Sequence, residues 1–514
     1  MGRKILFITT DQQRYDSLGC TGGRIARTPV IDGLAARGLV YERAHNQNVV
    51  CMPARSTMLT GQYVRTHGVW MNGVPLPESS PSIAAHLKEQ AGYHTALLGK
   101  AHFEPAFDPK GEWSEGRLAR ENSTGPYRGF DRVEFVMHGP VGFGHYPKFI
   151  AENHPEVVSG FYRQIYFDEK GTLCINAEGG GDTGATQVKL NPVPRELYHT
   201  DWVAERTIAY LESLPADADW FIWMSFPDPH HPWDPPSSEI SRIPWRDIPL
   251  PEGYPGSPDA CREILARKPH HWLDWYEGRG NINVEAPPNF VPARLTPDQI
   301  REINALTHVE NELIDEACGR VIEAVAARGW REDTDVFFTS DHGEFQGDFG
   351  LLFKGPYHID ALMRVPFVWA PAPSAGLPPA RIPEPVGHLD LATTFCDIAG
   401  VPVPNWNQGA ALPTEPGSNR ERVLTEWDSE WRGVSTSLRS IYRDGWLCTA
   451  YGPGTDYDGS EGELYDLRND PRQFENLWDD PSRRSLRDEL AADLAEHLPP
   501  EPDPEERLAW RSPV

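Results

Sequence analysis

The chain has 514 residues, with 48 Lys and Arg against 75 Asp and Glu, and therefore a formal net charge of -27. This length exceeds what one hydrophobic core usually supports, so we expect a large domain with a smaller one attached. The acidic balance argues against nucleic acid and anionic membranes as partners, because both attract basic surfaces, but it does not exclude a small anionic substrate held by a local cluster of cations.

The N-terminus and the cysteines indicate a reducing compartment. The chain enters the short apolar segment 5–10 almost at once, and this segment is too short for the core of a signal peptide or for a transmembrane helix. The seven cysteines are scattered, odd in number and without CxxC spacing, which favours free thiols over disulfides or a zinc site. We therefore predict a cytoplasmic protein.

Apolar segments that end in polar residues predict the strands of a parallel sheet. The four clearest are 4–10, 93–99, 220–226 and 336–339. Ligands of open α/β sheets bind at the carboxyl ends of such strands. The polar residues that follow these segments, and that we expect at one edge of the sheet, are Asp11, Gln12, Lys100, His102, His230, Asp341 and His342.

Helical spacing of apolar residues between these segments completes an α/β pattern. Helices are predicted over 28–38, 81–92, 197–214 and 296–329, the last opening with an N-cap threonine and a proline. The fold class is therefore α/β, with a large central, mostly parallel sheet flanked by helices. The loop-rich stretches 103–199 and 233–294 are expected to wall the pocket.

A Pro- and Gly-rich stretch near residue 410 marks a boundary between two domains. Short strand-like runs and a final helix follow it, which predicts a small antiparallel sheet of α+β type. We assign 1–404 to the catalytic domain, 418–498 to a C-terminal subdomain and 499–514 to an extended tail that is disordered or lies against a partner subunit. A homo-oligomer is expected.

The segment Cys51-Met52-Pro53-Ala54-Arg55 opens a helix that is expected to begin at Pro53. Helix N-terminal N–H groups and the Arg55 guanidinium converge there on the cysteine, which predicts an anion site. The order Cys-x-Pro-x-Arg, followed by Leu-Thr-Gly at 59–61, resembles the signature of the sulfatases of the alkaline phosphatase superfamily. In that family the cysteine is oxidised to formylglycine after synthesis.

Other motifs extend this resemblance over nearly the whole chain. Gly99-Lys100-x-His102, Pro229-His230-His231-Pro232, Ser340-Asp341-His342-Gly343 and Phe353-Lys354-Gly355 follow in the family's order. The resemblance implies catalytic or anion-binding roles for Cys51, Arg55, Lys100, His102, His230 and Lys354. It also implies a substrate contact for Asn72, which could equally be a turn residue, and metal ligation by Asp11, Gln12, Asp341, His342 and an oxygen of the modified Cys51.

The expected ligands suit one divalent cation. Their oxygen atoms favour Ca²⁺, whereas His342 also admits Mn²⁺ or Mg²⁺. Many sulfatases carry Asn at the position of His342, and the Asp-His form is shared with phosphonate monoester hydrolases and choline-sulfatase-like members. The resemblance further implies a formylglycine-generating enzyme as the partner for maturation.

The sequence is compatible with three functions. The first is a sulfatase of arylsulfatase type, in which the hydrated formylglycine attacks sulfur, His230 or Lys354 helps the ester oxygen leave, and His102 then takes a proton so that sulfate departs. The second is a phosphonate monoester hydrolase or phosphodiesterase of the same superfamily. The third is a non-catalytic protein that binds metal and anions. Lys100 and His102 favour the first, since phosphonate hydrolases of this group usually have other residue types there.

Overall fold

This computed structural model contains one large sheet, whose strands come from distant parts of the chain. The structure describes residues 2–108, 110–138, 144–167, 173–176, 178–279, 283, 285–287, 289–431 and 433–511. Neighbouring strands are parallel except β11, which is antiparallel to the strand on either side. The eight strands lie in the order β12 (Ala380–Gly387), β2 (Leu39–His45), β11 (Phe367–Ala370), β10 (Thr334–Ser340), β1 (Lys4–Thr10), β9 (Trp220–Ser225), β3 (His94–Gly99) and β4 (Arg132–Phe135).

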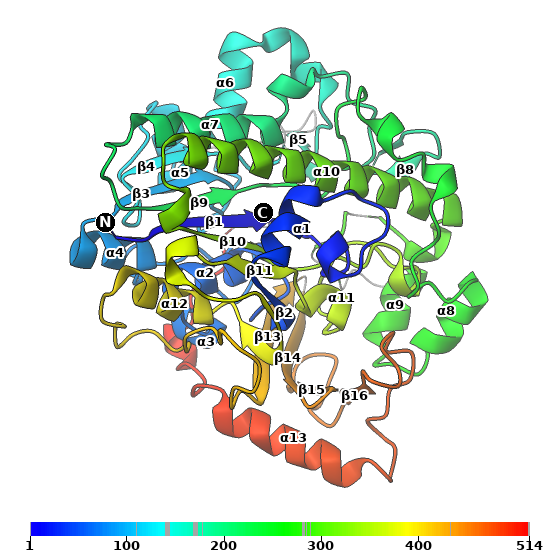
Figure 1. Ribbon diagram of the computed structural model, residues 1–514. Coiled ribbons are helices and arrows are strands. Elements are labelled where there is room, and N and C mark those ends of the chain that lie inside the picture. Colours follow the sequence, from blue (N-terminus) through cyan, green and yellow to red (C-terminus); the bar gives the residue numbers. More distant parts are fainter. Residues whose placement is uncertain are drawn as a thin grey trace.

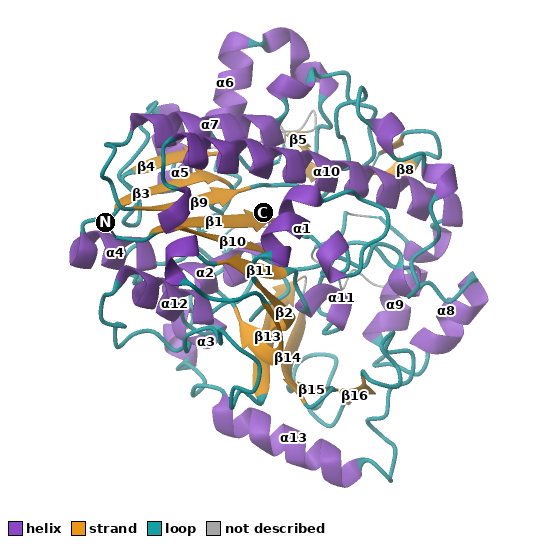
Figure 2. Cartoon of the chain, viewed as in Figure 1, coloured by secondary structure: helices purple, strands orange, loops and turns teal. Residues whose placement is uncertain are grey.

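Helices cover both faces of this sheet, as Figures 1 and 2 show. Successive side chains of a strand point to opposite faces, so Leu6 and Ile8 of β1 enter one core and Ile5 and Phe7 the other. The first core is closed by α1 (Pro29–Ala36), α7 (His199–Ser213) and α10 (Pro297–Ala327). The second is closed by α2 (Cys51–Thr60), α3 (Val64–His67), α4 (Ile83–Ala91) and α12 (Asp390–Ala399).

The predicted elements are present, with shifts of one or two residues at several of their ends. Helix α2 begins at Cys51 rather than at Pro53, because a proline in the first turn removes only an N–H that has no partner within the helix. The long α10 is continuous and starts with a capping box between Thr296 and Gln299.

The two loop-rich insertions add small elements around the carboxyl edge of the sheet. The first contains α5 (Ser114–Arg120), α6 (His145–Asn153) and the short strands β5 (Ile165–Phe167), β6 (Leu173–Ile175), β7 (Gly179–Gly180) and β8 (Ala185–Thr186). The second contains α8 (Pro258–Leu265) and α9 (His271–Glu277), and α11 (Asp360–Met363) follows β10. Both insertions contribute residues to the cavity around Cys51, as expected.

A separate four-stranded antiparallel sheet follows, so the predicted fold class is confirmed in both parts. Its order is β13 (Arg422–Trp431), β14 (Val434–Arg443), β15 (Trp446–Tyr451) and β16 (Gly462–Asp466). One face packs on α8, α9 and the segment 345–363, and the other packs on α13 (Arg484–His497). Both faces are therefore buried (Figure 1).

The C-terminal tail packs against an earlier segment of the same chain. The Trp70 indole donates to the Leu508 carbonyl (2.9 Å), and the N–H of Arg511 donates to the Gly73 carbonyl (2.8 Å). The described part of the tail is extended apart from one 3₁₀ turn, but it packs against the loop that follows α3, where the sequence suggested disorder or a partner subunit. The expected homo-oligomer stays a prediction. No helix in the described ranges is long and apolar enough to cross a membrane.

The contact between the second insertion and the smaller sheet predicts a pH-dependent stability. Lys268 is buried, and its Nζ donates to the Tyr465 hydroxyl (2.5 Å) and to the Gln473 carbonyl (2.7 Å). Burial lowers its pKa to about 8, whereas an unfolded lysine titrates near 10.4. Between these values the unfolded chain binds a proton that the folded chain does not, so raising the pH favours folding.

We therefore expect the free energy of unfolding of the wild type to gain on the order of 3 kcal/mol, relative to Lys268→Met, between pH 8 and pH 10.5. Urea unfolding followed at several pH values measures this difference. The exposed Lys110→Met is the matched control and should track the wild type. Parallel curves for the wild type and Lys268→Met would contradict the prediction.

Candidate active site

Strands of the large sheet end at a common edge and surround Cys51 with charged side chains. Asp11 follows β1, Asp341 follows β10, and Lys100 follows β3, with its backbone N–H donating to the carbonyl of Ser225 at the end of β9 (2.8 Å). Cys51 itself is the first residue of α2. All five residues are buried. The carboxyl edge therefore forms one enclosed polar site, as the strand-end pattern predicts.

Four potential metal ligands gather at this edge. The ligand atoms of Asp11, Cys51, Asp341 and His342 all lie within 4.8 Å of one another. Nδ1 of His342 lies 2.9 Å from the Gly343 carbonyl, which can only accept, so Nδ1 carries the proton and the lone pair of Nε2 faces Cys51 Sγ at 3.2 Å. Burial lowers the pKa of His342 to about 4, and a neutral imidazole is what a metal ligand requires. Two carboxylates and one imidazole fit a divalent cation.

Gln12 lies beside this cluster in a strained conformation. Its φ of 63° falls in the left-handed region, which residues other than glycine seldom adopt and which is enriched at functional sites. Its backbone N–H donates to Asp341 Oδ1 (3.0 Å), and its side-chain oxygen accepts from Lys354 Nζ (2.7 Å). The amide oxygen thus contacts the lysine, and metal ligation by Gln12 stays a prediction.

Arg55, a residue of α2, connects the strand ends. Its Nε donates to Asp341 Oδ2 (2.8 Å), and one Nη donates to the Lys100 carbonyl (2.9 Å) and to Ser225 Oγ (2.8 Å). The other Nη lies 3.6 Å from Asp11 Oδ2. Arg55 therefore orients both carboxylates of the candidate metal centre, and its contact with substrate oxygens stays a prediction.

The Lys100 ammonium faces the position of the nucleophile. It contacts the Asp11 carboxylate, and it lies 3.1 Å from His138 Nε2 and 3.7 Å from Cys51 Sγ. Gly99, the preceding residue, makes this placement feasible, because a Cβ there would lie 1.7 Å from a backbone oxygen of β9. The close approach of β3 to β9 thus requires glycine directly before the lysine.

Lys354 approaches Cys51 in a similar way. Its Nζ lies 3.6 Å from Sγ and 2.7 Å from His230 Nε2, in addition to its bond to Gln12. The preceding Phe353 has a φ of 68°, so the backbone here is again in the left-handed region. The two lysines therefore bring two cations to within 3.7 Å of one sulfur atom.

The two predicted catalytic histidines differ in their surroundings. Both ring nitrogens of His102 are buried and have no hydrogen-bond partner among the described residues. Burial and the nearby Lys100 hold its pKa well below the usual value, so the ring is neutral. The His230 ring, by contrast, stacks on the His138 ring with centroids 4.1 Å apart. Of these two described residues, His102 is therefore the one with both nitrogens available to a ligand, since both nitrogens of His230 contact other groups.

Asn72 contacts the first turn of α2. Its Oδ1 accepts from the N–H of Met52 (2.9 Å), and its Nδ2 donates to Glu285 Oε2 (3.0 Å). Both ends of the amide are therefore held by the protein, although the residue still lines the cavity that contains Cys51. A direct substrate contact for Asn72 stays a prediction.

Comparison with known proteins decides the family. Residues 3–401 match the family described as Sulfatase. The chain belongs to the sulfatase family. A second match, to the family described as N-sulphoglucosamine sulphohydrolase, C-terminal, covers residues 347–498. The predicted family and its type of enzyme are thus confirmed, and sulfatases normally depend on a metal.

Similar proteins match along almost the whole chain. The uncharacterized sulfatase YidJ of Escherichia coli (strain K12) is 26% identical over 512 residues, which are 98% of this chain and 89% of that protein. The arylsulfatase of Clostridium perfringens (strain 13 / Type A) is 25% identical over 507 residues, which are 97% of this chain and 95% of that protein. The phosphonate monoester hydrolase of Agrobacterium radiobacter shares the fold, with a TM-score of 0.76 at 23% identity over 96% of each chain.

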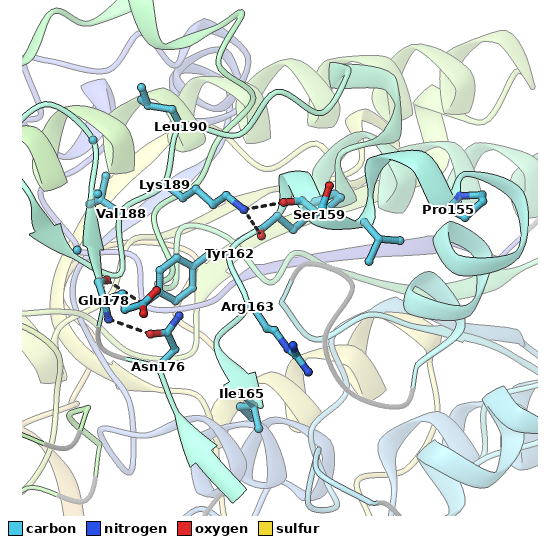
Figure 3. A pocket seen from close by; sticks show the side chains of 15 residues that line it. Pro155, Ser159, Tyr162, Arg163, Ile165, Asn176, Glu178, Val188, Lys189 and Leu190 are labelled. Atoms are coloured by element: carbon cyan, nitrogen blue, oxygen red, sulfur yellow. Dashed lines mark hydrogen bonds between the residues drawn. The ribbon is translucent and has the colours of Figure 1, made fainter. Parts of the chain in front are cut away.

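The sulfatase site opens into a small cavity beside a larger hollow. The cavity at Cys51 measures about 80 Å³, and the hollow next to it about 950 Å³. Ile165 lines both. Figure 3 shows the hollow, in which Lys189 donates to the carbonyls of Ser159 (2.7 Å) and Phe161 (2.7 Å). The cavity and the hollow therefore lie on either side of one shared lining residue, Ile165.

Three residues of the sulfatase site were missed by the sequence analysis. Ser225 ends an apolar strand, and this signal could have placed its hydroxyl at the site. His138 and Glu285 belong to the two long insertions, in which no pattern distinguished them from other loop residues. His138 is 8% exposed and lines the cavity with Cys51.

Removal of one carboxylate tests the candidate metal centre. Asp341 belongs to the cluster with Asp11 and His342, so we expect Asp341→Asn to lose bound metal and to lower kcat/KM by about 10²-fold or more. Metal content by elemental analysis and turnover of an aryl sulfate measure both effects. Asp335→Asn, at the other end of β10, is the matched control and should keep its metal. Full activity of Asp341→Asn after exhaustive chelation would reject the centre.

Proposed function

We propose that this sulfatase hydrolyses sulfate monoesters such as aryl sulfates, with formylglycine formed from Cys51 as the source of the nucleophile. The observation that carries the proposal is the approach of Lys100 and Lys354 to the same sulfur atom, in a cavity that also contains His102. Preorganised cations in a desolvated pocket stabilise an anionic group as charge moves onto its oxygens. A sulfate ester seated at residue 51 would meet both ammonium groups.

Of His230 and Lys354, we propose Lys354 as the donor of the leaving-group proton, and the contacts of His230 support this choice. Nδ1 of His230 contacts the His231 carbonyl, which can only accept a hydrogen bond. Nε2 of His230 is therefore the acceptor that faces the Lys354 ammonium at 2.7 Å. In this arrangement Lys354 holds the proton that the departing ester oxygen would take, and His230 keeps the lysine in place.

His102 is suited to remove a proton later in the cycle. It is neutral, buried in the cavity and free at both nitrogens among the described residues. A general base needs a lone pair within reach of the group that it deprotonates. We assign to it the proton transfer that accompanies release of inorganic sulfate.

Asp11, Asp341 and His342 would hold one divalent cation, with Gln12 and an oxygen of residue 51 as further candidates. When bound, the cation supplies Lewis-acid stabilisation of negative charge at residue 51. The donor set suits Ca²⁺ first and also admits Mn²⁺ or Mg²⁺. Maturation of Cys51 would require a formylglycine-generating enzyme as partner, and the substrate would be a small anionic ester.

Hydrolysis of phosphonate monoesters or phosphodiesters is the second candidate. Asp341 followed by His342 at the metal half-site is the observation that favours it, because phosphonate monoester hydrolases and choline-sulfatase-like members share that pair. Lys100 and His102 favour sulfate esters. The transition states of both reactions have similar shape and charge, so some activity towards both esters is expected.

The state of residue 51 tests the source of the nucleophile. We expect active protein to carry formylglycine at this position, because a helix N-terminus, two lysines and the metal ligands all converge there. Mass spectrometry of the peptide that contains residue 51 measures the change. Cys261, also buried, is the internal control and should remain a thiol. If fully active protein carried only unmodified Cys51, the sulfatase mechanism would be wrong and a different role for the site would follow.

Loss of His102 should separate the two halves of the reaction. With His102→Ala, release of the alcohol in the first turnover should persist, while steady-state turnover falls on the order of 10²–10⁴-fold because the general base is missing. Rapid mixing with an activated aryl sulfate reveals the burst of alcohol. His94→Ala, at the other end of β3, is the matched control. An unchanged steady-state rate, or a wild type that prefers phosphonate monoesters to every sulfate ester tested, would favour the second candidate.

A further inference from the structure

The two lysines at Cys51 are held by parallel sets of contacts. Lys100 contacts the Asp11 carboxylate, His138 Nε2 (3.1 Å) and Cys51 Sγ (3.7 Å). Lys354 contacts Gln12 Oε1 (2.7 Å), His230 Nε2 (2.7 Å) and the same Sγ (3.6 Å). An ammonium group has three N–H donors and no acceptor. In each lysine, two donors are thus used for orientation and the third faces residue 51.

The two histidines form one stacked pair. Their ring centroids are 4.1 Å apart and the ring planes differ by 21°. His138 is 8% exposed and His230 6% exposed. A lysine can only donate, so the contacts with Lys100 and Lys354 require a lone pair on Nε2 of each ring. Each ring is therefore the acceptor that fixes one ammonium group.

Packing alone does not account for His138. An apolar aromatic ring could stack on His230 equally well, but it would leave one N–H of a buried ammonium without an acceptor. Lysine has a flexible stem and a compact charge, so its direction depends on the acceptors around it. The imidazole of His138 therefore supplies a hydrogen-bond acceptor to Lys100, which a phenylalanine ring of similar shape cannot supply.

We propose that His138 is a positioning residue that directs Lys100 towards the nucleophile at residue 51, as the counterpart of His230 for Lys354. The inference rests on the proposed function, because it treats Lys100 as a group that binds the ester oxygens. His138 acts through Lys100, so its loss should lower kcat more than it raises KM: the ammonium still attracts the anion but no longer meets it in the reactive geometry.

Three substitutions distinguish an acceptor from a packing group. His138→Phe keeps the stacked ring and removes the acceptor, and we expect kcat for an aryl sulfate to fall 10- to 100-fold. His138→Gln places a carbonyl oxygen near the position of Nε2 and should restore kcat to within about 5-fold of the wild type. His138→Asn is too short to reach Lys100 and should behave like His138→Phe. Metal content and melting temperature show whether each variant is folded and loaded.

A double-mutant cycle then identifies the partner. In a Lys100→Ala background, His138→Phe should lower kcat less than 3-fold, because the ammonium group that His138 positions is already absent. In a Lys354→Ala background, it should keep its full 10- to 100-fold effect. The Lys354 cycle is the matched control, since that lysine is equally close to Cys51 but bonds the other histidine.

The outcomes separate this inference from the proposed function. A wild type that hydrolyses phosphonate monoesters but no sulfate ester would reject the proposed function, and the same cycle run on the phosphonate ester would still test His138. Equal effects of His138→Phe in both lysine backgrounds would overturn the inference. So would wild-type activity of folded, metal-loaded His138→Phe, or failure of His138→Gln to exceed His138→Asn.

Discussion

The guanidinium of Arg55 is the group on which the geometry of the site depends. From α2 it bonds Asp341 after β10, the Lys100 carbonyl after β3 and the Ser225 hydroxyl at the end of β9, and it lies 3.6 Å from Asp11 after β1. One planar group with five donors thus connects four strands that are far apart in the sequence. Without it, buried carboxylates would lose their partner, at a cost of about 3–5 kcal/mol.

The smaller sheet also supports the site, through the segment that precedes Cys51. The segment just before Cys51 bonds β13: the Asn48 side chain donates to the Glu426 carbonyl (2.8 Å), and the Thr425 hydroxyl donates to the Asn46 carbonyl (2.7 Å). Val49 and Val50 pack into the core that this sheet shares with α8 and α9. The C-terminal sheet therefore helps to set the start of α2, and its role in this sulfatase is more than that of an appended domain.

The sheet and most of the strand-end residues could be predicted because they follow from local rules. Buried parallel strands are continuous apolar runs, and their carboxyl ends meet at one edge, so Asp11, Lys100 and Asp341 had to be neighbours. His138 and Glu285 could not be predicted, because their positions depend on the path of long loops whose sequence carries no periodicity. The start of α2 was misjudged by two residues, since proline is accepted anywhere in a first turn.

The overall acidity of the chain and the anion site are compatible because the cations are buried. Lys100, Lys354 and Arg55 are buried and act over a few ångströms, whereas exposed charges are screened beyond roughly 8 Å. Glu285 is the one carboxyl that lines the cavity without belonging to the candidate metal centre, among the described residues. Burial raises its pKa, and its bond from Asn72 holds it at the wall. A carboxyl that is more readily neutral repels an incoming anion less, so the raised pKa of Glu285 reduces the repulsion that this residue exerts at the cavity wall.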